Sequence, residues 1–150
     1  MERTALAGLA VLGFAWIAAL FVAPITVASS NRMLALPSAL VYVAGSHICH
    51  QRAERSFHID GRQMPVCARC TGLYVSAAAA IPFALVAATT IPSRRSRTIL
   101  VLAALPTLVT WALEYWGLAP FSNVARAVAA LPLGFAAAWL VIGTLRGRML

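Results

Sequence analysis

The sequence predicts an all-α membrane protein, a bundle of four transmembrane helices with one further short apolar helix before Cys49. The chain is 61% hydrophobic and only 11% charged, whereas a soluble domain carries about 25% charged residues. Four apolar stretches match the roughly 20 residues that a helix needs to cross the hydrocarbon core. We find no internal repeat or linker, so residues 1–150 are expected to form a single integral membrane domain.

The first apolar stretch, residues 4–28, is predicted to be a membrane span. It ends in Thr26-Val27-Ala28, which resembles the cleavage site of a signal peptide. The stretch is longer than the 7–15 apolar residues typical of such a peptide, and the charges of Glu2 and Arg3 before it cancel. We therefore expect a retained helix.

The second stretch, residues 34–48, is apolar but short. A run of this length is as typical of a re-entrant or interfacial helix as of a fifth span, and we leave both alternatives open. Residues 51–66 after it are polar, with a turn expected at Asp60-Gly61.

Three further spans are expected after this polar segment. They cover residues 71–91, 98–117 and 124–145, and a basic loop at 93–97 separates the first two. Because only one span lies between residues 51–70 and this loop, the two must lie on opposite sides of the membrane. The hairpin at 117–123 then returns to the side of residues 51–70.

Glu114 and Arg126 are the ionisable residues inside the predicted spans. Such residues are costly in a bilayer and often functional. Both lie near the same face as the cysteines, where they are expected to pair with each other or to face the cysteine segment. A purely structural role near the helix ends is the alternative.

The segment 47–70 carries the residues best suited to chemistry. Cys67 and Cys70 form a Cys-x-x-Cys pair, and Cys49 and His50 lie upstream. Three thiolates and one imidazole suit a tetrahedral Zn²⁺, so these four residues are the predicted metal ligands. Another transition metal remains an alternative.

Other interpretations of the same residues stay open. His47 and His58 are alternatives to His50, because adjacent residues in a helix rarely bind one ion. The cysteines also fit a thiol-disulfide pair, Cys67 and Cys70, with Cys49 as a resolving thiol. A plain structural role is the third interpretation.

The net charge of +8 comes from twelve arginines against four acids. The arginines lie in loops and at helix ends, where they contact lipid phosphates and set orientation, so we expect membrane lipid and no nucleic acid as a partner. Arg55 and Arg69 lie among the cysteines and are predicted to contact an anionic small molecule or lipid head group. The basic residues at 93–97 and after residue 145 favour an outer-face position for the cysteine segment.

The residues CHQRAERSF at 49–57 and PVCARCTGLY at 65–74 resemble a family of small bacterial and archaeal membrane proteins, the domain of unknown function 2085. Glu114 and the Asn123-x-x-Arg126 motif fit this resemblance, although the family more often has Asp than Glu at that place. The resemblance implies a multi-span protein of the cytoplasmic membrane with the cysteine segment at its centre. It implies no activity.

The leading functional hypothesis is a zinc site that clasps residues 47–70 to the helix bundle. One alternative is a membrane thiol-disulfide oxidoreductase that uses Cys67 and Cys70. Another is a metal-dependent membrane hydrolase or a transporter component, with Glu114 and Arg126 in catalytic roles.

Overall fold

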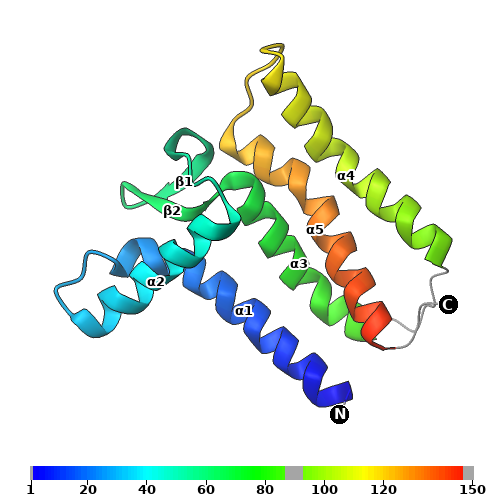
Figure 1. Cartoon of the computed structure of the whole chain (residues 1–150), viewed down its shortest axis with the longest axis horizontal. Coiled ribbons are helices and arrows are strands. Elements are labelled where there is room, and N and C mark those ends of the chain that lie inside the picture. The colour runs from blue at the N-terminus through cyan, green and yellow to red at the C-terminus, as the bar shows by residue number, and fades with distance from the viewer. Residues whose placement is uncertain (1, 87–92, 147–150) are drawn as a thin grey trace.

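The computed structural model describes residues 2–86 and 93–146 (Figure 1). These residues form five α-helices, one short 3₁₀ helix and one two-stranded antiparallel sheet. The elements in chain order are α1 (Glu2–Thr26), α2 (Arg32–Ile48), η1 (Ala53–Arg55), β1 (Ser56–Ile59), β2 (Arg62–Cys67), α3 (Ala68–Val86), α4 (Ser93–Tyr115) and α5 (Asn123–Leu145).

Four helices are long and apolar enough to cross a membrane, which confirms the predicted fold class. The candidate spans are Leu6–Thr26, Ala68–Val86, Arg95–Tyr115 and Asn123–Leu145. One detail of the prediction was wrong: residues 93–97 are not a loop but the first residues of α4. The expected end of the span at residues 71–91, that is residues 87–91, lies outside the described residues.

Helix α2 has only 17 residues and is not among the candidate spans, and the path of the chain agrees with this. Leu6 near the start of α1 packs in one cluster with Ala84 near the end of α3. Leu20 of α1 packs with Val66, just before α3 begins. The two helices are therefore antiparallel, and the chain between them must begin and end on one side (Figure 1). α2 and the β-hairpin both stay on that side.

The β-hairpin was not predicted from the sequence, which indicated only a polar segment with a turn. The turn itself is confirmed, because Asp60 and Gly61 both adopt positive φ angles of 50° and 74°, as two-residue hairpin turns require. Met64 and Val66 of β2 are buried against α1. The hairpin therefore covers the end of the bundle rather than lying free in solvent.

Helices α3 and α5 form the centre of the bundle and approach each other very closely. A Cβ atom added at Gly72 would collide with the backbone of Ala127, and one added at Gly134 would collide with the backbone of Leu73. Small residues at such contacts are typical of helix pairs in membranes. Helix α4 lies on the outside of α5 (Figure 1). The close pair fixes the start of α3 beside the start of α5.

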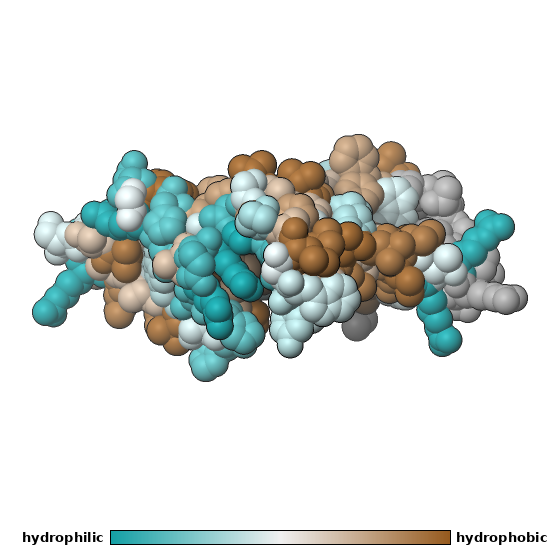
Figure 2. Space-filling view, turned by 90° about the horizontal axis from the view of Figure 1, so that it is seen from above, coloured by the Kyte–Doolittle hydropathy of each residue, from teal (hydrophilic) through white to brown (hydrophobic). Residues whose placement is uncertain are grey.

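The face at the hairpin end is mixed in polarity. Figure 2 views the molecule from above Figure 1 and shows hydrophilic side chains gathered toward the left, on the side of the β-hairpin and α2, with apolar side chains over the neighbouring helices. Trp111, Tyr115 and Trp116 near the end of α4 are exposed. Aromatic side chains at the end of a span are typical of the head-group level of a bilayer, which indicates where the membrane surface lies.

Candidate functional site

Three cysteines from separate elements converge at the hairpin end of the bundle. Cys49 caps the end of α2, Cys67 ends β2 and Cys70 lies in the first turn of α3. Their Sγ atoms all lie within 4.8 Å of one another. Because a Zn–S bond is about 2.3 Å, two thiolates on one tetrahedral zinc lie about 3.8 Å apart. A small side-chain adjustment therefore suffices for all three to bind one ion.

The end of α2 is positioned by its contact with β2. The backbone N–H of Cys49 donates to the carbonyl of Gly45 at 2.9 Å. Gly45 lies so close to β2 that a Cβ atom there would collide with the carbonyl of Pro65. A side chain at position 45 would push Cys49 away from the other two thiols.

The side chain of Gln51 stabilises the contact between α2 and β2 by hydrogen bonds. Its Nε2 donates to the carbonyl of Tyr42 at 2.8 Å and to that of Pro65 at 2.7 Å, which joins α2 to β2. Its φ angle is 46°, a left-handed conformation that is unfavourable for a residue with a side chain. The backbone carbonyl of Gln51 accepts a hydrogen bond from the side chain of Gln63. Neither glutamine was predicted from the sequence to have a role at the site.

The surroundings of Cys67 favour the thiolate form of its side chain. Its backbone N–H donates to Sγ of Cys49 at 3.1 Å, which ties the two segments together. Hydrogen bonding from the side chain of Cys70 lowers the pKa of the Cys67 thiol to about 5, in spite of burial, which raises it. A thiolate is the form that binds metals and attacks disulfides.

The histidines do not join the cysteine group in the described part of the chain. The predicted ligand His50 is exposed, and the group of converging ligand atoms contains the three thiols alone. The backbone is extended at Cys49, with φ −147° and ψ 142°, and successive side chains of an extended chain point to opposite sides. The alternatives His47 and His58 are also exposed and lie outside the group.

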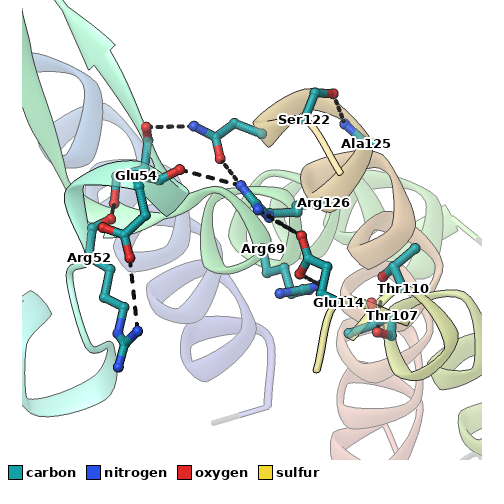
Figure 3. Close-up of polar contacts among 11 residues, drawn as sticks. Arg52, Glu54, Arg69, Thr107, Thr110, Glu114, Ser122, Ala125 and Arg126 are labelled. Carbon is teal, nitrogen blue, oxygen red and sulfur yellow. Dashed lines mark hydrogen bonds and ion pairs between the residues drawn. The ribbon is translucent and has the colours of Figure 1, made fainter. Parts of the chain in front are cut away.

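Glu114 pairs with two arginines, as Figure 3 shows. Its Oε2 lies 2.7 Å from Nη2 of Arg69, and its Oε1 lies 2.7 Å from both Nε and Nη2 of Arg126. The Glu114 side chain is only 7% exposed, against 14% for Arg69 and 13% for Arg126. The pairing of Glu114 with Arg126 confirms one of the two arrangements expected from the sequence, and Arg69 is an additional partner.

The same network reaches the hairpin (Figure 3). Nη1 of Arg126 donates to Oδ1 of Asn123 at 2.6 Å and to the carbonyl of Glu54 at 3.4 Å. Nδ2 of Asn123 donates to the carbonyl of Ser56 at 2.8 Å. These contacts confirm that the start of α5 and the polar segment lie on one side.

A cavity of about 500 Å³ opens between the cysteines and the arginines. All three cysteines contribute to its wall, together with exposed aromatic residues of α4. The polar residues that line it are His50, Gln51, Arg52, Arg55, Arg69 and Arg126. The predicted anion contacts, Arg55 and Arg69, thus share one cavity with the predicted metal ligands.

The fold and this site define an integral membrane protein whose cysteine cluster lies at one end of a four-helix bundle. A model of the family described as predicted membrane protein (DUF2085) matches residues 49–140, and the chain belongs to this family. The match begins at Cys49 and includes Cys67, Cys70, Glu114 and Arg126.

Two curated relatives are archaeal. An uncharacterized protein of Methanothermobacter thermautotrophicus is 34% identical over 97 residues, which cover 63% of this chain and 84% of the relative. An uncharacterized protein of Methanocaldococcus jannaschii is 54% identical over 37 residues, which cover 25% of this chain and 24% of that protein. No solved structure matches the chain. The comparisons therefore give a family and no activity.

Proposed function

We propose that Cys49, Cys67 and Cys70 bind one transition-metal ion, zinc, which clasps residues 47–70 to the helix bundle. The observation that carries this proposal is the approach of three sulfur atoms within 4.8 Å, from segments up to 21 positions apart in the chain. Thiolate ligands favour zinc, copper(I) and iron–sulfur centres. Of these metals, zinc prefers tetrahedral coordination, in which the three thiolates would take three of the four positions.

A clasp has a clear physical use here. An isolated two-stranded hairpin is marginally stable in water, and this hairpin must hold its place at the end of the bundle. A metal on Cys49, Cys67 and Cys70 would bind the end of α2, the end of β2 and the start of α3 to a single point. The free energy of metal binding would then stabilise the fold.

The proposed site has three protein ligands rather than the four expected from the sequence. The fourth position of a tetrahedral ion is left to water, to His50 after a rotation of its ring, or to an anion from the cavity. Sites with three protein ligands and one open position are typical of catalytic zinc. When bound, such an ion supplies Lewis-acid chemistry, which keeps a hydrolase among the candidate functions.

For Glu114 we propose a positioning role rather than that of a general base. Both of its carboxylate oxygens accept hydrogen bonds from arginines at 2.7 Å. Both oxygens are thus already occupied by arginine donors, which leaves neither free to face a substrate. Glu114 instead holds Arg69 and Arg126 in place at the cavity wall, so Arg126 is a candidate anion contact rather than an acid.

Elemental analysis of the purified full chain tests the metal site. We expect about one equivalent of zinc per chain, falling several-fold in Cys70→Ser and in Cys49→Ser. His47→Ala is the matched control, because His47 is exposed and outside the cysteine group, and it should keep its zinc. His50→Ala shows whether that ring supplies the fourth ligand. Wild-type protein without any bound transition metal would contradict the proposal.

A thiol-disulfide oxidoreductase is the second candidate. Its specific support is Cys67, which lies directly before the first residue of α3 and has a thiol pKa of about 5. A low thiol pKa at the start of a helix is typical of reactive cysteines. The Cys67 thiolate would attack a partner disulfide and release one partner thiolate. The Cys70 thiolate would then attack the mixed disulfide, release the second partner thiolate and leave a Cys67–Cys70 disulfide. Stoichiometric formation of this bond in zinc-free protein would favour this candidate.

We propose that the cysteine segment lies on the outer face of the cytoplasmic membrane. Several arginines of this side are engaged in the fold: Arg69 and Arg126 bind Glu114, and Nη1 of Arg62 donates to the carbonyls of Pro24 and Ile25 at 3.2 Å. Engaged arginines are weak orientation signals, and the basic residues at the opposite end then point to the cytoplasm. A C-terminal green fluorescent protein should fluoresce, whereas a C-terminal alkaline phosphatase should be inactive.

A further inference from the structure

The arginine-rich cavity carries more positive charge than the described residues around it neutralise. Arg52, Arg55, Arg69 and Arg126 all line the cavity, and none of the described lining residues is acidic. Among the lining arginines, Arg52 forms a long, exposed pair with Glu54 at 3.9 Å, and Arg69 and Arg126 share the single carboxylate of Glu114. One carboxylate between two guanidinium groups leaves a net charge of +1.

This excess charge is largely buried. The side chains of Arg69 and Arg126 are only 14% and 13% exposed. A buried charge without a counter-ion is strongly destabilising. The geometry therefore calls for a negatively charged group in the cavity.

Arg69 also has an unused donor. Its Nε is buried and has no hydrogen-bond partner in the described structure, although Nη2 is bound to Glu114. Buried guanidinium N–H groups are almost always paired. An oxyanion beside Arg69 would supply the missing acceptor.

Two helices begin at this place and add to the positive potential. Helix α3 begins at Ala68, next to Arg69, and α5 begins at Asn123, one turn before Arg126. The N-terminus of a helix carries a partial positive charge of about half a unit and favours anions. Figure 3 shows both arginines at these helix starts, facing Glu114.

The position of the cavity relative to the membrane surface indicates which anion it binds. Trp111 and Tyr115 line its outer wall and are both exposed, with stacked rings 5.3 Å apart. Such aromatic pairs lie at the head-group level of a bilayer, where phosphate is the abundant anion. Guanidinium groups bind phosphate through paired hydrogen bonds, and several arginines around one cavity suit a group with two negative charges.

We propose that this cavity is a binding site for a phosphate group that carries two negative charges, as a phosphate monoester does, held by Arg55, Arg69 and Arg126. The phosphate belongs either to a lipid head group that enters past Trp111 and Tyr115 or to a soluble phosphate compound. The site requires arginines and not thiolates, so it does not depend on the proposed metal centre.

Two binding measurements on the full chain in phosphatidylcholine nanodiscs test this proposal and separate the two sources. In the first, inorganic phosphate is titrated by calorimetry at constant ionic strength. In the second, the nanodiscs contain a small fraction of phosphatidic acid, and thermal stabilisation is compared with nanodiscs that contain an equal fraction of phosphatidylserine. Stabilisation by phosphatidic acid without phosphate binding assigns a lipid, and phosphate binding without stabilisation by phosphatidic acid assigns a soluble compound.

Arg55→Gln is the informative variant, because it removes one lining charge and leaves the Glu114 network intact. We expect about 10- to 100-fold weaker binding, the loss of one hydrogen bond to a charged group. Arg32→Gln is the matched control, because Arg32 is an exposed arginine at the same side of the bundle, outside the cavity, and it should bind as wild type does.

Three results would overturn the phosphate site. These are the absence of binding in both measurements, equal weakening by Arg55→Gln and Arg32→Gln, and stabilisation by phosphatidylserine equal to that by phosphatidic acid. Zinc content is measured on the same samples. Protein freed of zinc by a chelator should still bind phosphate, so a failure of the metal proposal and a failure of the phosphate proposal are distinguishable.

Discussion

Oε2 of Glu114 accepts a hydrogen bond from Nη2 of Arg69 at 2.7 Å, across 45 positions of sequence. This bond joins the end of α4, which otherwise lies on the outside of the bundle, to the first turn of α3, where Cys70 is located. The other oxygen of the same carboxylate binds Arg126 of α5. One acid thus links three helices beside the cysteine cluster, and its loss should affect both the fold and the cavity.

The first prediction concerns this carboxylate. Glu114→Gln leaves two largely buried guanidinium groups without a counter-charge, and we expect a loss of about 3–5 kcal/mol in the free energy of unfolding. Unfolding by SDS in detergent micelles measures it. Glu54→Gln is the control, because the Glu54–Arg52 pair is 3.9 Å long and well exposed, and such pairs contribute about 0–1 kcal/mol. Equal effects of the two substitutions would show that the pairing of Glu114 is not structurally important.

The second prediction concerns the close contact between α3 and α5. Gly134→Ala places a methyl group against the backbone of Leu73 and the hydroxyl of Ser76. We expect about 1–3 kcal/mol of destabilisation, the usual cost of overpacking, measured by the same titration. Gly8→Ala adds the same methyl group in α1, where no atom lies within 4 Å, and should be neutral or slightly stabilising. A neutral Gly134→Ala would mean that the two helices are farther apart than described.

The third prediction concerns the acidity of Cys67. In protein freed of metal by a chelator, Cys67 should react with iodoacetamide once the pH exceeds about 5, because its thiolate form is present above its pKa. Reactivity should fall as the pH drops through that value. Peptide mass spectrometry after short reaction times gives the rate for each cysteine.

Two variants identify the origin of this low pKa. Cys70→Ala removes the hydrogen bond that lowers the pKa most, so the reactivity midpoint of Cys67 should move to higher pH. Cys49→Ala removes a smaller contribution and should move it less. A wild-type midpoint between about pH 8 and 9, the range of an ordinary thiol, would refute this account of the site.

The fourth prediction concerns Gln51. Gln51→Ala removes both hydrogen bonds that hold the end of α2 against β2, and Cys49 should become less well placed for a metal. We expect zinc affinity to fall about 10- to 100-fold, as is typical when a group that orients a ligand is lost. Competition with a fluorescent zinc chelator measures it. Ser46→Ala, an exposed position on the same helix turn, should leave the affinity unchanged.

Much of the architecture was predictable from composition and run length. Apolar stretches long enough to cross a bilayer identified four spans, because lipid requires both an apolar surface and helical backbone pairing. The parity of the spans then placed Glu114 and Arg126 on the side of the cysteines, which the Asn123–Ser56 hydrogen bond confirms. The hairpin escaped prediction because β1 and β2 are short, 4 and 6 residues, and the three buried residues of β2 are consecutive rather than alternating.

The site was predictable in its residue types and not in its arrangement. The Cys-x-x-Cys spacing made Cys67 and Cys70 evident candidate ligands, but only the structure showed that Cys49 joins them while His50 lies outside the group of converging ligand atoms. The partnership of Arg69 with Glu114 depends on the position of α4 against α5, which no local pattern encodes.

The sequence by itself determined a chain of four apolar helices and a cysteine segment on one side of them. Hydropathy can be read from each segment separately, and the side of each connecting segment follows from the number of spans before it. Only the tertiary structure decided which side chains meet. The close packing of α3 on α5 brings Arg69 and Arg126 to one carboxylate, and the fold of the hairpin onto α1 brings three sulfur atoms together. Such contacts depend on packing between segments that lie far apart in the chain.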